Sequence, residues 1–451
     1  MKNRSLAAAC LSMVAASLVV LAASDATAAG RTTAGDVGTY AAAVPGARFG
    51  TTRALAAKPD APEPFEVKPG VTLISPLNPT RDDISLQIMM AINHSFRGTK
   101  IRIATWNFDS WRFVGALTAA HKRGVSVRLI LSRQLYNAQG PRGPAGSLAR
   151  NLAGFGNAQR PANKKSKVIT CDHSCRGRGG AMHSKFYVFS KAGKSKRVVM
   201  NSSANLTAAS RNVQWNDLYT VVDSKPAYRA YMNVFKEMEL DSPASYMDFT
   251  DGKLFGFFYP GLSQPDIVMT MLNQVRCDGA KNAGINGKTS IRVAQDVFNN
   301  KRGAAIARKL LALFRSGCNV RVVYSQAVGA SKAFISQLPH NHLVQDRDGD
   351  CSYDRYLHAK ILSISGVYGS KRGERIVLNG SGNWSATALK SDEQGMVVNS
   401  DSAERKYSAW INGMMGIHLV SAPCDPTQIE DGEARVTGRS ARIDPYAEME
   451  G

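Results

Sequence analysis

A short segment that carries a histidine and a lysine two residues apart occurs once in each half of this chain. Both copies lie in apolar runs typical of β-strands, in which side chains at i and i+2 point to the same face. Each histidine should therefore emerge beside its lysine. An imidazole beside an ammonium group indicates phosphate chemistry, and the repeat itself requires a fold of two similar halves. The two copies read Met182-His-Ser-Lys-Phe-Tyr-Val-Phe and Leu357-His-Ala-Lys-Ile-Leu-Ser-Ile.

Each copy is followed by a turn of small residues and then by an acidic residue. The first turn is Asn201-Ser-Ser-Ala-Asn205 and precedes Asp217, and the second is Asn379-Gly-Ser-Gly-Asn383 and precedes Glu393. The order His, Lys, Asn, acid therefore repeats in full. Two ordinary core histidines would not carry the same partners at matching separations, so we interpret the pattern as a duplicated catalytic half-site.

With these residues the chain resembles the phospholipase D superfamily, whose signature is H-x-K-x4-D followed by a Gly-Ser turn with an asparagine. The resemblance covers about residues 66 to 425. Each copy departs from the signature at one position, because the family Asp falls at Ser190 and at Ser365. Some members, such as tyrosyl-DNA phosphodiesterases, also lack this Asp and are active.

The resemblance implies two similar α/β/α sandwich halves related by a pseudo-two-fold axis, with both His-Lys pairs in one cleft. It also implies a phosphohistidine intermediate and no metal or other cofactor. By analogy His183 is the nucleophile, and His358 is the general acid and then the general base.

The chemistry of the individual residues agrees with this mechanism. Lysine and asparagine donors can hold the non-bridging oxygens of a phosphodiester as its transition state forms. Asp217 and Glu393 would orient the imidazoles by accepting their second N–H, or would be ordinary surface carboxylates. Ser203 and Ser381 would add hydroxyl donors. The predicted catalytic residues are His183, Lys185, Asn205, His358, Lys360 and Asn383.

Strand and helix patterns occur in matching order in the two halves. The segment Thr99-Lys-Ile-Arg-Ile-Ala-Thr-Trp matches Thr289-Ser-Ile-Arg-Val-Ala-Gln-Asp, and a second strand pattern follows each. The helical patterns between them, 113–121 and 306–314, end at Gly124 and Gly317, as helix C-termini commonly do. This alternation predicts an α/β fold with a mainly parallel sheet covered by helices on both faces.

The N-terminal residues predict export. A basic start, an apolar run over 6–22 and small residues near position 28 are typical of a secretory signal peptide. We therefore expect a secreted protein that acts as a monomer. The predicted divisions are a signal peptide (1–28), a flexible leader (29–64), a first half (65–245), a second half (246–425) and a polar tail (426–451).

Six cysteines remain after removal of the signal peptide, and an even number in an exported chain favours disulfides. Proximity favours Cys171–Cys175 and Cys277–Cys318 and leaves Cys351 with Cys424, although other pairings are open. A zinc site is disfavoured because no second C-x-x-C accompanies these cysteines. The acidic run over 346–350 matches a calcium loop poorly, so we predict no metal there.

Two segments have competing interpretations. Leu254-Phe-Gly-Phe-Phe-Tyr-Pro could dip into a membrane, but its equivalence to Val71-Thr-Leu-Ile-Ser-Pro favours an opening strand. The aromatic residues Phe186, Tyr187 and Trp384 could contact acyl chains at the cleft, although aromatic residues on strands more often belong to the core.

The formal net charge of +22 favours polyanionic partners, which include anionic lipid surfaces and nucleic acids. The favoured function is a secreted phospholipase D that releases headgroups to leave phosphatidic acid, with transfer to other alcohols as an added capacity. We expect its substrate to be a phospholipid or another phosphodiester, with peripheral contact to a membrane surface. The alternatives are an extracellular nuclease of the same superfamily and a non-catalytic binder of anionic polymers or surfaces.

Overall fold

The structure is a computed structural model that describes the two halves of the repeat. The predicted signal peptide, leader and tail lie outside the described residues, as does the predicted Cys351–Cys424 bridge. In the part of the chain that the structure describes, no helix has both the length and the apolar character needed to cross a bilayer. The described residues are 65–78, 81–261, 264–349 and 353–423.

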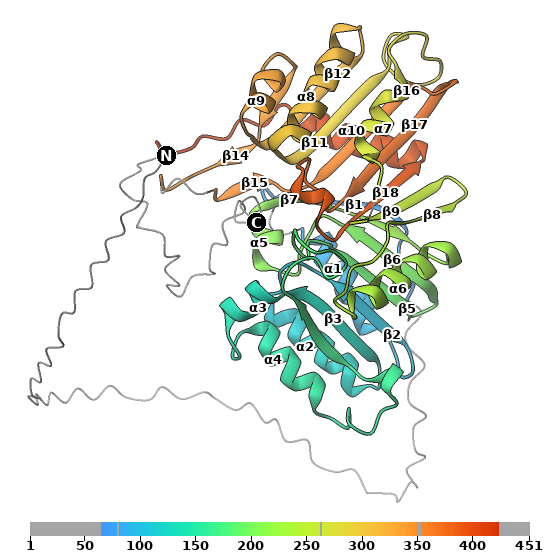
Figure 1. Ribbon diagram of the computed structural model, residues 1–451, viewed down its shortest axis with the longest axis vertical. Helices are drawn as coiled ribbons and strands as arrows, with labels where there is room; N and C mark the ends of the chain where they lie inside the picture. The colour runs from blue at the N-terminus through green and yellow to red at the C-terminus, as the bar shows by residue number, and fades with distance from the viewer. Residues whose placement is uncertain (1–64, 79–80, 262–263, 350–352, 424–451) are drawn as a thin grey trace, which may run out of the picture. The chain divides into compact units, whose positions relative to one another are not determined.

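Two nine-stranded sheets form the framework, one for each half of the repeat (Figure 1). The first runs in the order β14 (Val344–Gln345), β15 (Arg355–Leu357), β7 (Gln214–Val221), β6 (Ser195–Ser202), β5 (Phe186–Ala192), β2 (Lys100–Ala104), β3 (Ser126–Ser132) and β4 (Lys167–Cys171), with β1 (Gly70–Ile74) beside β7. The second runs in the order β13 (His340–His342), β12 (Asn319–Ala327), β11 (Ser290–Phe298), β16 (Lys360–Tyr368), β17 (Lys371–Gly380), β18 (Glu393–Asn399), β9 (Leu254–Tyr259) and β8 (Met247–Asp251), with β10 (Val275–Arg276) beside β16.

Helices connect and cover these strands. Those of the first half are α1 (Asp83–Asn93), α2 (Trp111–Lys122), α3 (Arg133–Gln139), α4 (Pro144–Ala153), the 3-10 turn η1 (Ala162–Lys164), α5 (Ala208–Asn212) and α6 (Lys225–Met238). Those of the second half are α7 (Ile267–Asn273), α8 (Asn300–Arg315), α9 (Ala330–Ile335), the 3-10 turn η2 (Thr387–Leu389) and α10 (Asp401–Met414).

Both sheets are mixed, so the predicted mainly parallel sheet was wrong. Strand β2 runs parallel to β3, and β11 runs parallel to β12, because the helices α2 and α8 cross over between them. The strands β5 and β16, which follow the two histidines, instead run antiparallel to β2 and β11. Each continues into an antiparallel hairpin with β6 or β17, whose tight turns contain Gly193 and Gly369 at positive φ. No helix fits into so short a connection.

Helices cover each sheet on both faces, which gives the predicted α/β/α halves. Alternate residues of β5 enter different cores: Tyr187 packs with α1, α2 and α4, whereas Phe186 packs with α6. In the second half Leu362 packs with α8 and α9, and Ile361 packs with α10. The cores beside α6 and α10 contain residues of both halves, so the two halves bury a common interior.

Several local predictions are confirmed. The pattern over 254–259 is the strand β9, which pairs with β18 as β1 pairs with β7. The helices α2 and α8 end just before Gly124 and Gly317, which have φ of 89° and 91°. The disulfides Cys171–Cys175 and Cys277–Cys318 are both present.

Candidate active site

The two motif histidines lie where the halves meet, and each is anchored to a strand of the other half. The backbone N–H of His358 donates to the carbonyl oxygen of Trp215 on β7 at 3.0 Å, because β15 brings this segment alongside β7 in the first sheet. The backbone N–H of His183 donates to the carbonyl oxygen of Asp392, just before β18, at 3.2 Å. Both histidines are buried, at 3% and 4% exposure.

The imidazole rings are held in the same crosswise manner. Nδ1 of His183 lies 2.8 Å from Oε1 of Glu393, and Nδ1 of His358 lies 2.9 Å from Oδ1 of Asn216. In each case the residue that contacts the ring directly follows the residue whose carbonyl oxygen accepts the backbone N–H of the histidine. Glu393 follows Asp392, and Asn216 follows Trp215. Since Nδ1 is engaged on both rings, Nε2 is the nitrogen that can react with a substrate.

A serine supports each of these acceptors. Ser203 Oγ donates to Asn216 Oδ1 at 2.9 Å, and Ser381 Oγ donates to the carboxylate of Glu393. Each serine Oγ also accepts the backbone N–H of the residue that follows the ring partner. Ser203 accepts that of Asp217, and Ser381 accepts that of Gln394, both at 3.0 Å. Asn216 is therefore the structural equivalent of Glu393. The predicted serines hold the groups that orient the imidazoles.

Asp217 does not orient a histidine, which corrects the prediction. Neighbouring side chains on a strand point to opposite faces, so Asp217 on β7 faces away from the ring that Asn216 holds. Its Oδ2 accepts hydrogen bonds from Asn379 Nδ2 and Tyr407 Oη, both at 2.8 Å. Burial raises the pKa of this carboxyl, while the donors Asn379, Tyr407 and Ser203 act to lower it. Its place is in the buried network between the halves.

Both predicted lysines reach the site, and their surroundings differ. Nζ of Lys185 donates to the carbonyl oxygen of His183 at 2.7 Å and lies 5.7 Å from the ring centre of Trp106. Nζ of Lys360 donates to the carbonyl oxygen of His358 at 2.6 Å and to Oδ2 of Asp296 at 2.9 Å. The two half-sites therefore converge but are not chemically identical.

The two half-sites lie close enough for the lysines of both to act on the charge of His358. Burial lowers the pKa of His358 well below its usual value, and the positive charges of Lys360 and Lys185 lower it further. This imidazole is therefore neutral in the resting protein. A bound phosphodiester would bring negative charge to the same place and favour its protonation.

The two predicted asparagines lie in the turns that follow β6 and β17. Oδ1 of Asn205 accepts Thr105 Oγ1 at 3.2 Å and the backbone N–H of Asn107 at 3.3 Å, which leaves its NH₂ group as the donor. Oδ1 of Asn383 is buried with no hydrogen-bond partner among the described residues. Arg302 donates to the backbone carbonyl of Asn383 at 3.0 Å and fixes this turn.

Comparison with known proteins places this arrangement in a family. The sequence profile of the family described as "Cardiolipin synthase, PLD-like domain" matches residues 88–239 and 283–415, more than half of the chain. The chain belongs to the phospholipase D superfamily. No curated protein matches this sequence.

Solved structures of other proteins have a similar fold. Phosphatidylserine synthase from Haemophilus influenzae Rd KW20 has a TM-score of 0.52 at 12% identity over 77% of this chain and 86% of that chain. Polyphosphate kinase from Porphyromonas gingivalis has a TM-score of 0.51 at 11% identity over 79% of this chain. The chain covers 54% of that kinase, and at such identities the likeness concerns the fold alone.

The superfamily Asp that this chain lacks falls far from the imidazoles. Ser190 and Ser365 lie five residues beyond the lysines on β5 and β16, about 16 Å along an extended strand. Ser190 Oγ accepts the backbone N–H of Lys100 at 2.8 Å, and Ser365 Oγ accepts that of Gly284 at 3.1 Å. Both serines therefore tie strands to their neighbours, and their place in the fold gives them no contact with the reacting groups.

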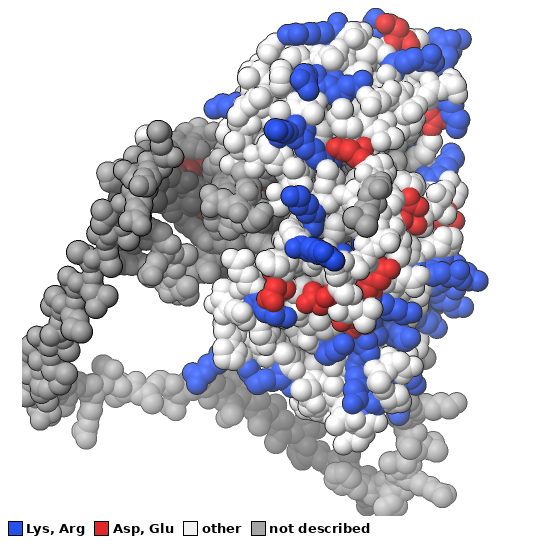
Figure 2. Space-filling view, viewed as in Figure 1, with Lys and Arg blue, Asp and Glu red and all other residues white. Residues whose placement is uncertain are grey.

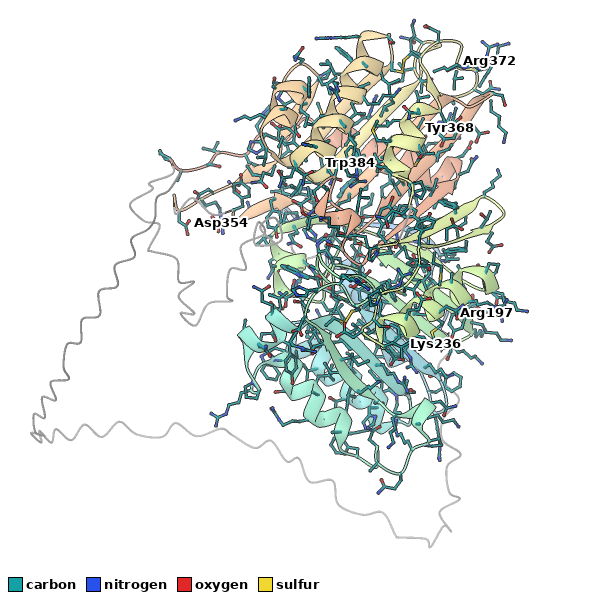
Figure 3. The ribbon with its side chains drawn as sticks, in the orientation of Figure 1. Arg197, Lys236, Asp354, Tyr368, Arg372 and Trp384 are labelled. Atoms are coloured by element: carbon teal, nitrogen blue, oxygen red, sulfur yellow. A yellow bond between two sulfur atoms is a disulfide. The ribbon has the colours of Figure 1, made fainter. Side chains whose placement is uncertain are left out.

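The three aromatic residues considered for lipid contact belong to the core. Phe186 and Tyr187 are fully buried. Trp384, labelled in Figure 3, is 2% exposed and lies in the second half, where its ring packs edge-on against that of Phe298. The acyl-chain interpretation was therefore wrong for these residues, because their side chains fill the spaces between sheet and helices.

Asp392 is a functional neighbour that sequence reasoning missed. It is fully buried and accepts Ser174 Oγ at 2.9 Å, the backbone N–H of Arg176 at 3.1 Å and that of Cys175 at 2.5 Å. Burial raises its pKa to about 7, and these donors act to lower it. The loop closed by Cys171–Cys175 thus holds the residue that anchors His183 and precedes Glu393.

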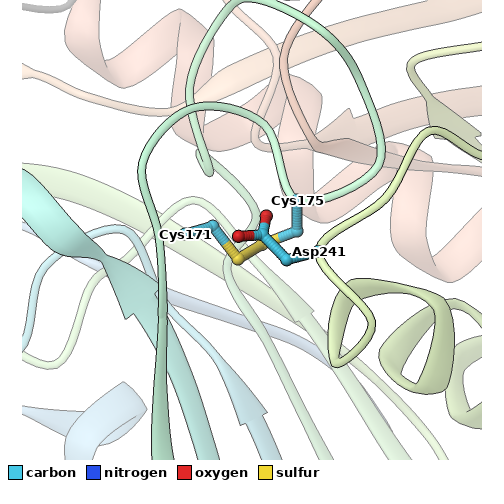
Figure 4. A group of neighbouring side chains, drawn as sticks. All are labelled: Cys171, Cys175 and Asp241. Atoms are coloured by element: carbon cyan, nitrogen blue, oxygen red, sulfur yellow. A yellow bond between two sulfur atoms is a disulfide. The ribbon is translucent and has the colours of Figure 1, made fainter.

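Among the residues that the structure describes, two clusters of potential metal ligands lie outside this site. In the first, Asp241 lies beside Cys171 and Cys175, but the two sulfurs are bonded to each other and offer no thiolate (Figure 4). In the second, carboxylates of Asp346, Asp348 and Asp354 lie within 4.8 Å of one another. Asp346 and Asp354 accept backbone N–H groups of their own loop, at Gly349 and Arg347.

Proposed function

We propose that this protein is a secreted phospholipase D, which converts a glycerophospholipid and water into phosphatidic acid and the free headgroup alcohol. The observation that carries the proposal is the crosswise anchoring of His183 and His358. Each ring presents Nε2 to a shared site that also contains two lysines. That set suffices for displacement at a phosphodiester through a covalent intermediate.

In the first step, Nε2 of His183 forms a bond to phosphorus as the bond from phosphorus to the headgroup oxygen breaks. His358 gives its Nε2 proton to that oxygen, and the alcohol leaves. In the second step, His358 takes a proton from water as the water oxygen bonds to phosphorus. The bond from phosphorus to His183 then breaks, and phosphatidic acid is released. An alcohol in place of water would give transfer. Lys185 and Lys360 neutralise the non-bridging oxygens in both steps.

The unequal ring partners support this division of roles. His183 gains a positive charge when its Nε2 bonds to phosphorus, and the Glu393 carboxylate stabilises that charge. His358 is held by the neutral amide of Asn216 and lies near two ammonium groups, so its protonated form is acidic. An acidic imidazolium is well suited to protonate the leaving oxygen.

Location and charge support lipid as the substrate. The N-terminal residues have the pattern of a signal peptide, so we propose that the protein works outside the cell as a monomer. Lysine and arginine side chains lie over both halves on the face seen in Figure 2, and the net charge is +22. Such a surface favours peripheral contact with anionic membranes. Nucleic acid shares the same charge preference, and a nuclease is the alternative function.

A direct comparison of substrates tests the proposal. The secreted protein would be incubated in chelator with phosphatidylethanolamine vesicles and, separately, with plasmid DNA, alongside the double variant His183→Asn, His358→Asn. Headgroup release by the natural protein and its loss in the variant are the expected results. Plasmid cutting that falls steeply with salt would favour the nuclease. Binding to vesicles without turnover would overturn both enzyme assignments.

A further inference from the structure

Besides the difference between Asn216 and Glu393, the repeat breaks its symmetry at a second position inside the site. The segments that lead into the two half-sites, 99–106 and 289–296, align without a gap, and Trp106 after β2 corresponds to Asp296 on β11. The ring of Trp106 lies 5.9 Å from that of His183, centre to centre. Oδ2 of Asp296 lies 2.9 Å from Nζ of Lys360 and 3.9 Å from Nε2 of His358. An aromatic ring thus borders one histidine and a carboxylate borders the other.

The reaction geometry shows which part of a substrate would meet this carboxylate. In an in-line displacement the leaving oxygen lies opposite the attacking atom. If His183 attacks, the headgroup alcohol departs beside Nε2 of His358, and Asp296 lies next to that nitrogen. The water or alcohol of the second step occupies the same place. Asp296 is buried at 3% exposure, so little solvent would screen its charge.

A carboxylate at this position distinguishes between leaving groups by charge. Its two oxygens can accept several donors at once, so contact with Lys360 is compatible with contact to a further N–H group. An ammonium group two carbons from the ester oxygen would gain a charge-assisted hydrogen bond. A leaving group with a second phosphate, as in a nucleic acid, would meet repulsion at short range.

We infer that Asp296 is a specificity-determining residue of the leaving-group site, which selects phosphodiesters whose leaving alcohol carries an ammonium group. This inference rests on the proposed function and deepens it, because it names the class of headgroup. It also opposes a nuclease function on grounds independent of the surface charge, since the leaving side of a nucleic acid is anionic.

The test compares two monomeric short-chain lipids that differ only in the leaving group. One is dihexanoyl phosphatidylethanolamine, and the other is dihexanoyl phosphatidylpropanol, whose leaving alcohol also needs a proton but has no ammonium group. The ratio of kcat/KM for the first lipid to kcat/KM for the second would be measured for the natural protein and for Asp296→Asn. We expect this ratio to fall about tenfold in the variant, the scale of a lost hydrogen bond to a charged group.

Two further variants make the result decisive. Asp296→Glu keeps the negative charge and should change the ratio less than Asp296→Asn, and thermal melting would verify that both variants fold. Trp106→Phe alters the equivalent position beside His183 and should slow both substrates alike. An unchanged ratio in a folded Asp296→Asn, with both rates reduced equally, would make Asp296 only a positioning residue for Lys360 and overturn the inference. No headgroup release by the natural protein would instead overturn the proposed function.

Discussion

Nδ1 of His183 lies 2.8 Å from Oε1 of Glu393, and these two residues come from different halves of the chain. The corresponding contact in the other direction joins His358 to Asn216 at 2.9 Å. Neither half alone forms a complete pair of histidine and acceptor. Each half supplies the imidazole of one pair and the acceptor of the other. The site therefore exists only when the halves are docked.

Replacing Glu393 with Gln should lower kcat about 10- to 100-fold and leave KM within about threefold. The amide can still accept from Nδ1, but it cannot stabilise the positive charge that His183 gains on attack. Glu239→Gln is a matched control, because the carboxylate of Glu239 pairs with Arg128 at 2.8 Å and contacts neither imidazole. Equal loss of activity in both variants would show that Glu393 matters only for folding.

Replacing His358 with Asn should trap a phosphoryl group on His183 when the substrate carries p-nitrophenol. This leaving group needs no proton, so the first step proceeds, whereas the second lacks its general base. Mass spectrometry of the quenched protein would locate an acid-labile adduct on the peptide with His183. An adduct on His358 in the reciprocal His183→Asn variant, with none here, would reverse the two roles.

The pKa of His358 also predicts a pH dependence of stability. Its folded pKa is depressed by burial and by neighbouring positive charges, while an unfolded histidine titrates near 6.5. Below about pH 6.5 the unfolded state binds a proton that the folded state does not, so this residue reduces the free energy of unfolding as pH falls. His358→Gln should therefore gain stability relative to the natural protein between pH 7 and pH 5, by up to about 1.4 kcal/mol per pH unit. Urea unfolding at both pH values would measure this, and parallel stability curves would contradict it.

Ser190→Ala and Ser365→Ala should reduce stability without slowing the reaction. Each removes an acceptor for a backbone N–H of a neighbouring segment, a loss of about 1 kcal/mol. The expected kcat lies within about twofold of the natural value, because neither serine contacts an imidazole or a lysine of the site. A large fall in kcat with unchanged melting temperature would show that these positions serve catalysis.

The sequence predicts the site residues that belong to the repeated motif. It does not predict those whose role depends on which face of a strand their side chain occupies. The two His-Lys pairs, both asparagines and Glu393 follow from the duplicated motif alone. The choice between Asn216 and Asp217 depends on which neighbour faces the cleft, and that is set by the pairing of β7 with β1, β6 and β15. The motif predicts an acid at this place, because a carboxylate is a common partner of a catalytic imidazole, whereas the ring of His358 is held by the amide of Asn216.

The pairing of a second-half strand with the first sheet could not be predicted from the sequence either. The segment over 344–357 belongs to the second half in sequence, yet β15 pairs with β7 in the first sheet. Its short strands have no periodicity that would name their partner. The substitution of Asp296 for Trp106 was visible in the aligned repeats, but its meaning required the contact with Lys360 and His358.

Removal of the two disulfides should affect stability and activity in opposite order. Cys277–Cys318 closes a loop with a sequence separation of 41, and Cys171–Cys175 closes one of 4. From loop-closure entropy, replacing the first pair with serines should cost about 4 kcal/mol and replacing the second about 2 kcal/mol. Activity should follow the opposite order, because the loop of Cys171–Cys175 holds Asp392, whose carbonyl oxygen anchors His183 and whose neighbour Glu393 orients its ring.

Both double variants would be unfolded in urea to obtain stability and assayed at a temperature where each remains folded. The expected result is a larger fall in kcat for Cys171→Ser, Cys175→Ser, despite its smaller loss of stability. If kcat instead followed stability across the two variants, the small loop would have no particular connection to the histidine, and the Asp392 contacts would be purely structural.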